Sequence, residues 1–345
     1  MRSAVPKSSR AGPRGEQALL AGIRALARRA TNRRVPLGIG DDCALVRLRA
    51  SEDLAVTTDL SIAGRHFNLD WHPPEVIGHR TLARGLSDLA AMGARPVAAF
   101  LSLGLPRGLA GKWLERFLAG FFALATAYDV PLAGGDLAES PIAVADIVLI
   151  GAIRRGKALL RSGARPGDLI YVTGKLGGAA AGLAELGKLA GSRQRTGPQT
   201  SIPHPLGIPA RLREMLAFHL YPQPRIAQGL WLARRSMATA AIDLSDGLST
   251  DLAHLCEESG VAAEVDAAAL PVHPAATLKQ ELHGGEDYEL LFTASPSTRV
   301  PRSLAGVPVT RIGNIVRRRA SRPQVALMTA RGSEPLEPEG WEHFS

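Results

Sequence analysis

Six aspartates in five separate stretches lie next to glycines or other small residues, and together they could bind a divalent cation. They are Asp42, Asp59, Asp88, Asp136, Asp243 and Asp246. Carboxylates gathered at one place repel one another unless cations lie between them. Ligation by oxygen alone, without His or Cys, is typical of Mg²⁺, which keeps several waters and shares the phosphates of a substrate. The pattern therefore predicts a magnesium site that handles a polyphosphate.

The same aspartates also have a purely structural interpretation. Gly-Asp pairs are common in turns, and Asp246 could cap the helix that follows it. For any one Asp the structural interpretation is favoured, whereas five stretches that repeat a strand end, a small residue and a carboxylate favour a shared site. Spacing along the chain leaves the convergence of the six side chains open.

Two familiar phosphate-binding motifs are absent from the sequence. The Walker pattern fails because Lys175 is followed by Leu176 and because Leu169 stands five residues before Gly174. The dinucleotide fingerprint fails at Gly38, since Cys43 occupies the position of its third glycine. A nucleotide would therefore be held by something other than a P-loop or a Rossmann turn.

The elements that must position the aspartates alternate between strands and helices. Apolar periodicity predicts helices over residues 16–30, 75–92, 106–128 and 245–260, and strands over 43–48, 54–59, 97–105, 130–136, 142–153, 238–244 and 262–266. Asp88 falls off the apolar stripe of its helix, and Asp246 lies in the first turn of the helix it begins. We expect the carboxylates to project from one edge of a sheet, where α/β proteins bind ligands.

Length and composition predict a two-domain α/β (α+β) enzyme. A chain of 345 residues exceeds one ordinary core, and 46% hydrophobic residues with 36 glycines are typical of such proteins. We predict a disordered basic tail at 1–14, an N-terminal domain at 15–155 and a C-terminal domain at 156–345 that carries an exposed polar insertion at 187–209. No run is apolar enough to span a bilayer and no signal peptide is evident, so a cytoplasmic protein without membrane partners is expected.

The spacing of the cysteines and the distribution of the basic residues argue against two classes of protein. Cys43 and Cys256 lack the spacing of a zinc site or a disulfide framework, and we interpret both as small buried residues. The net charge of +9 could indicate nucleic acid binding. However, the basic runs such as 317–319 lack interleaved aromatic residues and any helix-turn-helix pattern, which favours charges that serve solubility.

Seven stretches follow one another along the chain in this order: GIGDDCALV, VTTDLSIAGRHF, LSDLAAMGARP, GGDLAES, LLRSGARPGDLIYVTG, AIDLSDGLSTDL and HGGEDYEL. Together they resemble thiamine-monophosphate kinases, and the terminal GWEHF is similar to the ending of that family. They span about three quarters of the chain. That family belongs to an ATP-binding superfamily that includes aminoimidazole ribonucleotide synthetase. The N-terminal extension and the polar insertion after Lys188 depart from the family but lie outside its motifs.

The resemblance implies a two-domain aminoimidazole ribonucleotide synthetase-like fold, a homodimer paired through the N-terminal sheets, and ATP bound with several Mg²⁺ ions at the shared cleft. The reaction that it implies converts ATP and thiamine phosphate to ADP and thiamine diphosphate. The positions that match metal ligands are Asp42, Thr57, Thr58, Asp59, Asp88, Asp136, Asp243 and Asp246. Those that match ATP contacts are Gly135, Asp136, Arg161 and Ser245, and those that match thiamine phosphate contacts are His66, Glu286 and Trp341.

The chemistry of this reaction needs no general base. The attacking phosphate oxygen is already anionic near neutral pH, so positioning and charge neutralisation dominate. Glu286 could accept a hydrogen bond from an aminopyrimidine, and Trp341 could cover the cationic thiazolium. Without the resemblance, packing would be the better interpretation of His66 and Trp341.

Two further interpretations of the sequence compete with this one. The nearer is another ATP-using enzyme of the superfamily. A selenophosphate synthetase would need a reactive Cys or selenocysteine near the N-terminus, and a hydrogenase-maturation protein would need a C-terminal Cys; this sequence has neither, because Cys43 and Cys256 lie inside motifs. A basic nucleic-acid-binding protein is the more distant one, and it would bind with a steep dependence on salt.

Overall fold

A computed structural model describes residues 16–28, 32–37, 39, 45–191 and 212–341. The predicted tail at 1–14, Asp42 with its neighbours in 40–44, and most of the predicted insertion lie outside the described residues. The described helices are α1 (Glu16–Arg28), α2 (Pro74–Ala91), α3 (Lys112–Ala127), α4 (Gly178–Gly191), α5 (Arg213–Leu220), α6 (Ile226–Arg235), α7 (Leu248–Ser259) and α8 (Leu278–His283), with 3₁₀ turns at Arg107–Leu109 and Ala267–Ala269. None of these described helices is both long and apolar enough to cross a membrane.

The strands form two sheets. They are β1 (Glu52–Ile62), β2 (Arg95–Leu105), β3 (Leu132–Glu139), β4 (Val144–Arg154), β5 (Leu169–Thr173), β6 (Ala240–Asp243), β7 (Ala262–Asp266), β8 (Leu290–Ala294), β9 (Ser303–Leu304), β10 (Val307–Val316), β11 (Val325–Thr329) and β12 (Gly332–Pro335). The first four make one sheet in the order β1-β4-β2-β3, and the other eight make the second. This mixed α/β arrangement agrees with the predicted fold class.

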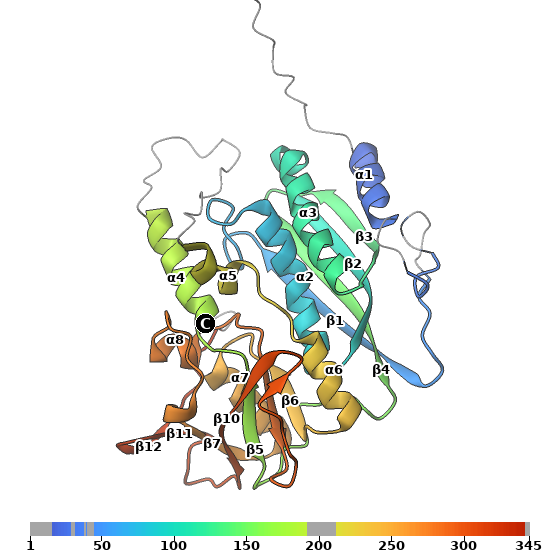
Figure 1. Cartoon of the computed structure of the whole chain (residues 1–345). Coiled ribbons are helices and arrows are strands. Elements are labelled where there is room, and N and C mark those ends of the chain that lie inside the picture. Colours follow the sequence, from blue (N-terminus) through green and yellow to red (C-terminus); the bar gives the residue numbers. More distant parts are fainter. Residues whose placement is uncertain (1–15, 29–31, 38, 40–44, 192–211, 342–345) are drawn as a thin grey trace, which may run out of the picture.

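The N-terminal sheet is covered on one face by α2 and α3 (Figure 1). Helix α3 connects the parallel strands β2 and β3, while β4 pairs antiparallel with both β1 and β2. The apolar stripe predicted for α3 is buried and includes Trp113, Phe117 and Phe121. Helix α2 begins with Pro74 in its first turn, where a missing backbone N–H costs nothing, and 15 of its residues are buried.

Two glycines allow α2 and α3 to approach closely. A Cβ added to Gly78 on α2 would lie 2.0 Å from the carbonyl oxygen of Phe117 on α3. In the reverse direction, a Cβ on Gly120 of α3 would lie 1.8 Å from the carbonyl oxygen of Glu75. The backbones of the two helices therefore touch where each has a glycine, and this contact fixes the position of α2 over the sheet.

The C-terminal sheet has the order β12-β11-β7-β10-β5-β8-β6, with β9 paired to the end of β10. Its pairs are antiparallel except for β7 with β11. Helix α7 packs on β6, β7 and β11, and its Leu252, Leu255 and free Cys256 are fully buried in this core. The burial of Cys256 agrees with its interpretation as a small core residue.

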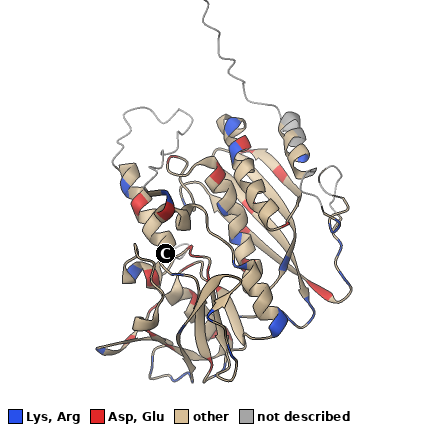
Figure 2. Cartoon of the chain, in the orientation of Figure 1, with Lys and Arg blue, Asp and Glu red and all other residues tan. Residues whose placement is uncertain are grey.

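The two halves share one continuous hydrophobic cluster. It joins Leu82 and Leu86 of α2 to Leu232 of α6 and to Phe292 of β8. Helix α2 contacts α6 and β6 directly, so it lies between the two sheets. Acidic and basic residues are interspersed over both halves (Figure 2).

Three expectations about local structure are wrong, and one helix was missed. Residues 45–48 form no strand beyond an isolated bridge of Leu45 with Leu37. Helix α7 begins at Leu248, so Asp246 precedes the helix instead of lying in its first turn. Helix α5 was not anticipated, and the start of the predicted insertion, 187–191, is the last turn of α4.

The expected common sheet edge is also not found. Asp59 lies within β1, Asp88 on α2 and Asp243 at the end of β6 in the other sheet. Asp59 and Asp88 therefore approach Asp243 across the boundary between the two sheets. Small residues suggested strand ends or glycine turns for most of these stretches, but Gly134 and Gly135 before Asp136 instead pack closely against β2.

Because Gly120 faces backbone atoms that cannot move aside, Gly120→Ala should lower the free energy of unfolding by about 1–3 kcal/mol. The measurement is urea denaturation followed by circular dichroism. Gly22→Ala on α1 is the control, because no atom lies within 4 Å of a Cβ placed there and alanine favours helix. Equal stability of the two variants would contradict the close contact of α2 and α3.

Candidate active site between the two halves

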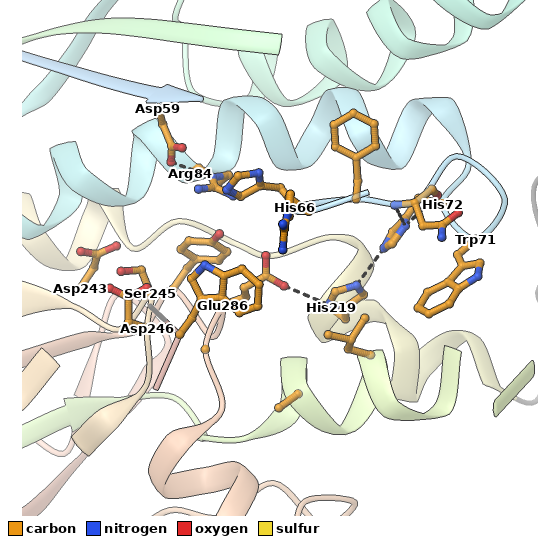
Figure 3. A pocket seen from close by; sticks show the side chains of 18 of the residues that line it. Asp59, His66, Trp71, His72, Arg84, His219, Asp243, Ser245, Asp246 and Glu286 are labelled. Atoms are coloured by element: carbon orange, nitrogen blue, oxygen red, sulfur yellow. Dashed lines mark hydrogen bonds and ion pairs between the residues drawn. The ribbon is translucent and has the colours of Figure 1, made fainter. Parts of the chain in front are cut away.

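A cavity of about 560 Å³ opens between the two halves of the chain. Figure 3 shows Asp59, Asp243 and Asp246 towards one end, Trp71 and His72 at the other, and His66 and Glu286 between them. The predicted site residues among those that line it are Asp59, His66, Asp88, Asp243, Ser245, Asp246, Glu286 and Trp341. Segments far apart in the sequence therefore contribute to a single cavity.

Helix α2 supplies a polar face to this cavity. Arg80, Arg84 and Asp88 recur every four residues, a spacing that places side chains on one side of a helix. Arg80 and Ser87 are buried, and each contacts the C-terminal half. The helix that closes the core of the N-terminal half is thus also the wall of the cavity.

Two carboxylates face each other at the acidic end. Asp88 accepts a hydrogen bond from the Thr57 hydroxyl of β1, and Asp243 accepts one from the Ser87 hydroxyl at 2.6 Å. Burial and the nearby Asp243 carboxylate raise the pKa of Asp88 to about 7. Burial likewise raises the pKa of Asp243, while its hydrogen bond from Ser87 and the charge of Arg161 oppose the shift. The pair is therefore unfavourable in its doubly ionised form unless a cation lies nearby.

Asp59 has a cationic partner within the chain. The Arg84 Nε donates to the Asp59 carboxylate at 2.7 Å, and both side chains are about four-fifths buried. Both residues line the cavity, on its N-terminal wall. A metal ligated by Asp59 would compete with this ion pair, and the charge released from Arg84 would then face the cavity.

The buried carboxylate of Asp251 holds the turn that carries Ser245 and Asp246. Asp251, at 2% exposure, accepts hydrogen bonds from the backbone N–H groups of Asp246 and Gly247 at 3.0 and 3.1 Å. Gly247 has a φ of +113°, and a Cβ there would lie 2.8 Å from the backbone of His283. The turn is therefore held from inside the first turn of α7, which leaves the Asp246 side chain at the cavity wall.

Glu286 is held in a left-handed backbone conformation, with a φ of 69°. Its N–H donates to the Ser245 carbonyl at 2.8 Å, and a Cβ on the preceding Gly285 would lie 2.5 Å from the same oxygen. Its carboxylate receives Arg80 on one oxygen and faces His219 Nδ1 at 3.4 Å on the other. A non-glycine residue in this region is costly and persists only where the surroundings enforce it.

Two of the predicted substrate-contact residues are placed by backbone contacts. The Ile62 N–H donates to His66 Nδ1 at 3.1 Å, which orients the imidazole beside the cavity. The Trp341 N–H donates to the Asp246 carbonyl at 3.2 Å, and Gly340 precedes it in tight contact with that same carbonyl. The end of the described chain is thus attached to the acidic turn, and Trp341 remains half exposed at the cavity.

The remaining predicted residues lie elsewhere. Thr58 and Asp136 are on the outward face of the N-terminal sheet, opposite the face covered by α2, and Gly135 is in β3 beside Leu101. Arg161 does not line the cavity, although its charge lowers the pKa of Asp88 and Asp243. Asp42 lies outside the described residues. One chain alone therefore brings together most of the predicted set but not all of it.

The donor set at the acidic end suits a hard divalent cation. Asp59, Asp88, Asp243 and Asp246 offer carboxylate oxygens. Burial and neighbouring carboxylates raise the pKa values of Asp88 and Asp243, so a cation there would stabilise their ionised forms. Within the described part of the chain, no three such groups already sit at metal-binding distance from one another. The residues fit magnesium by chemistry.

The chain is similar to known proteins over most of its length. Residues 40–154 match the N-terminal domain of AIR synthase related proteins, and residues 165–325 match their C-terminal domain. Thiamine-monophosphate kinase of Salmonella typhimurium is 41% identical over 325 residues, which cover 90% of this chain and 93% of that protein. The chain belongs to the thiamine-monophosphate kinase family. It is accordingly a kinase with the two-domain fold of that family.

Solved structures of this family share the fold over nearly the whole chain. The crystal structure of thiamine-monophosphate kinase from Stenotrophomonas maltophilia has a TM-score of 0.75 at 38% identity, and the match covers 91% of this chain and 96% of that one. A structure described as AaThiL complexed with AMPPCP and TMP has a TM-score of 0.72 at 30% identity, and the match covers 96% of this chain and 97% of that one.

Several residues of the site were missed by the sequence reasoning. They are Arg80, Arg84, Ser87, His219 and Asp251. For the arginines a signal existed, because Arg80, Arg84 and Asp88 are spaced four apart on a helix otherwise rich in apolar residues. For His219 none existed, since its helix was not anticipated and its contacts lie more than 60 residues away.

Replacing Asp88 by Asn removes a carboxylate whose pKa is raised above its unfolded value. The ionised form is penalised in the folded state, so its cost grows as pH rises from about 4 through 7. In the metal-free protein at pH 8, Asp88→Asn should therefore raise the free energy of unfolding by on the order of 2 kcal/mol. The gain should shrink as pH falls towards 4.

Urea denaturation in the presence of a chelator at pH 8, 6 and 4.5 provides the measurement. Asp53→Asn, at an exposed position of β1, is the control and should change little at any of these pH values. A gain that stays constant with pH, or a loss at pH 8, would contradict the electrostatic strain at this end of the cavity.

Proposed function

We propose that this chain transfers the γ-phosphoryl group of ATP directly to thiamine phosphate, giving ADP and thiamine diphosphate. Membership of the family and the complex of a relative with AMPPCP and TMP support this reaction. The observation that carries it for this chain is the cavity with two chemically different parts. The acidic end has carboxylates suited to metal-bound phosphates, and the rest of the cavity has Glu286 near its middle and the Trp71 ring towards the far end.

Magnesium, held by Asp59, Asp88, Asp243 and Asp246 together with Asp42, would neutralise the phosphate oxygens and bring the two phosphate groups together. Thr57 and Ser87 orient two of these carboxylates through the hydrogen bonds described above. Arg161 and Ser245 are assigned to ATP. No general base is assigned, because the acceptor phosphate is already anionic near neutral pH.

The part of the cavity beyond the acidic end suits the thiamine part of the acceptor. Glu286 presents a carboxylate that can accept a hydrogen bond from the amino group of an aminopyrimidine. Trp341 lies at the rim and can cover the cationic thiazolium with its ring. His66 lies between the two ends, where the acceptor phosphate would pass.

A homodimer would account for the residues that face away from the cavity. Leu54, Val56 and Leu60 alternate along β1 on the outward face of the N-terminal sheet and are 53%, 56% and 47% exposed. Strand β1 is also an edge of that sheet. Thr58 and Asp136 share this face, so pairing of two such faces would bring their predicted ATP and metal contacts to the boundary between the subunits.

An ADP-release assay with Mg²⁺ and a panel of acceptors tests the reaction. Thiamine phosphate should support turnover, while thiamine and buffer alone should not. Asp243→Asn should lower kcat by about 100-fold or more, since it removes a group that stabilises transition-state charge, whereas Asp53→Asn should leave kcat unchanged. Turnover with another acceptor but not with thiamine phosphate would refute the assignment.

Light scattering coupled to gel filtration tests the dimer. Val56→Glu places a charge in the middle of the exposed apolar row and should yield a monomer at micromolar concentration. Leu278→Glu on α8 alters an equally exposed leucine outside that face and should leave the dimer intact. The proposed pairing of the sheets would be refuted if the unsubstituted protein is a monomer or if Val56→Glu remains a dimer.

A further inference from the structure

A row of buried polar groups ends on the Glu286 carboxylate. His72, at 2% exposure, and His219, at 1%, face each other with their Nε2 atoms 3.0 Å apart. On the far side of the second ring, His219 Nδ1 lies 3.4 Å from Glu286 Oε2 (Figure 3). Arg80 donates both to the His219 carbonyl and to the other Glu286 oxygen. None of these contacts is explained by the reaction as described above.

A backbone hydrogen bond determines which tautomer each of the two histidines adopts. The Asn68 N–H donates to His72 Nδ1 at 3.0 Å, so that nitrogen carries the lone pair and Nε2 carries the proton. The proton on His72 Nε2 then points at His219 Nε2, which must accept it. The remaining proton of His219 is consequently on Nδ1 and is directed at Glu286.

The opposite arrangement is less favourable. His72 Nδ1 also lies 3.1 Å from the Asn68 carbonyl, to which it could donate if both tautomers were reversed. His219 Nδ1 also lies 3.4 Å from Arg80 Nη1, and its lone pair could accept from that group in the reversed pair. The same lone pair would, however, face the Glu286 carboxylate at 3.4 Å, and the Asn68 N–H would lose its acceptor. Buried donors and acceptors are almost always paired, so the first arrangement is preferred.

The charges of the row are compatible with this arrangement. Burial and the Arg80 charge lower the pKa of His72 to about 3 and also lower the pKa of His219, so both rings are neutral near pH 7. Burial raises the pKa of Glu286, but Arg80 and the hydrogen bond from His219 outweigh it and hold that pKa well below its usual range. Glu286 is therefore an ionised carboxylate with a fixed donor on each oxygen.

We propose that His219 is a positioning residue that orients the Glu286 carboxylate towards the aminopyrimidine of thiamine phosphate, with His72 fixing its tautomer. The inference rests on the proposed function, in which Glu286 contacts that ring. A carboxylate has about four lone-pair sites, and Arg80 and His219 occupy one on each oxygen. The remaining lone pairs face the cavity, where the Glu286 side chain is one quarter exposed. His219 therefore sets which lone pair meets the substrate amino group.

The row also spans the two halves, which makes a purely structural role the natural competitor. Arg80 and His72 come from the N-terminal half, whereas His219 and Glu286 come from the C-terminal half. A network that only joined the halves would affect stability and would leave the discrimination between substrates unchanged. The two roles are therefore separable by measuring KM for each substrate.

Steady-state kinetics of His219→Leu in the full-length protein with Mg²⁺ test the proposal. KM for thiamine phosphate should rise about 10-fold, since one hydrogen bond to a charged group is lost, while KM for ATP should stay within twofold. His219→Asn places an amide N–H near the position of Nδ1 and should restore KM for thiamine phosphate to within about threefold.

A second readout uses the 4-oxo analogue, oxythiamine phosphate, which lacks the amino donor. The unsubstituted protein should prefer thiamine phosphate by kcat/KM, and His219→Leu should reduce that preference by about the same 10-fold. An unchanged preference would overturn the proposal, and so would KM values for ATP and thiamine phosphate that rise together.

His79→Leu is the matched control. Like His219, His79 is a buried imidazole, and it lies on α2. Its Nε2 donates one hydrogen bond across the boundary, to the Pro222 carbonyl at 2.8 Å, but His79 does not line the cavity. It should lower thermal stability and leave both KM values unchanged. A rise in KM for thiamine phosphate equal to that of His219→Leu would show that loosening the boundary is enough, and would overturn the positioning role.

Nitrogen NMR of the unsubstituted protein gives a test that requires no folded variant. His219 should be the Nδ1–H tautomer and His72 the Nε2–H tautomer at pH 7. The reverse pair of tautomers would overturn the proposal. Failure of the unsubstituted protein to turn over thiamine phosphate would instead refute the proposed function, and it would do so whatever the tautomers are.

Discussion

The structure depends on a helix whose charged side chains are buried between two sheets. Arg80 and Ser87 of α2 are almost fully buried, and Arg84 and Asp88 line the cavity beside them. Buried charges are tolerated only when they are paired, and removing one partner of such a pair typically costs about 3–5 kcal/mol. The partners come from β1 and from the C-terminal half, so the ionic contacts of α2 and the approach of the two halves depend on each other.

Three backbone turns complete the cavity on the C-terminal side. The turn with Ser245 and Asp246 is touched by Gly285, which precedes Glu286, and by Gly340 at the end of the described chain. Each of these glycines lies closer to a carbonyl oxygen than a side chain would permit. Because the three backbones are in direct contact, the positions of Asp246, Glu286 and Trp341 are coupled, and movement of one turn would displace all three.

The carboxylates at the acidic end and in the middle of the cavity differ in how far their charge is compensated. Glu286 has Arg80 and His219 as fixed donors, so it is a ready acceptor for a neutral N–H group. Asp88 and Asp243 face each other with hydroxyl donors and a more distant Arg161, and their pKa values are raised. A carboxylate pair in this state favours protonation or a cation, whereas a compensated one favours a hydrogen-bonded ligand. Charge compensation thus distinguishes two kinds of ligand within one cavity.

The sequence by itself determined the two-domain α/β class, most of the long elements, the buried aromatic stripe of α3 and the identities of the candidate acidic residues, because these depend on local periodicity and on ordered motifs. The tertiary structure alone decided that Asp88 and Asp243 are neighbours, that Asp136 faces away from them, and that α5 delivers His219 to Glu286. Those contacts join residues that are 155 positions apart for Asp88 and Asp243, and 67 apart for His219 and Glu286. No local pattern encodes such distances, since they result from the packing of α2 between the sheets.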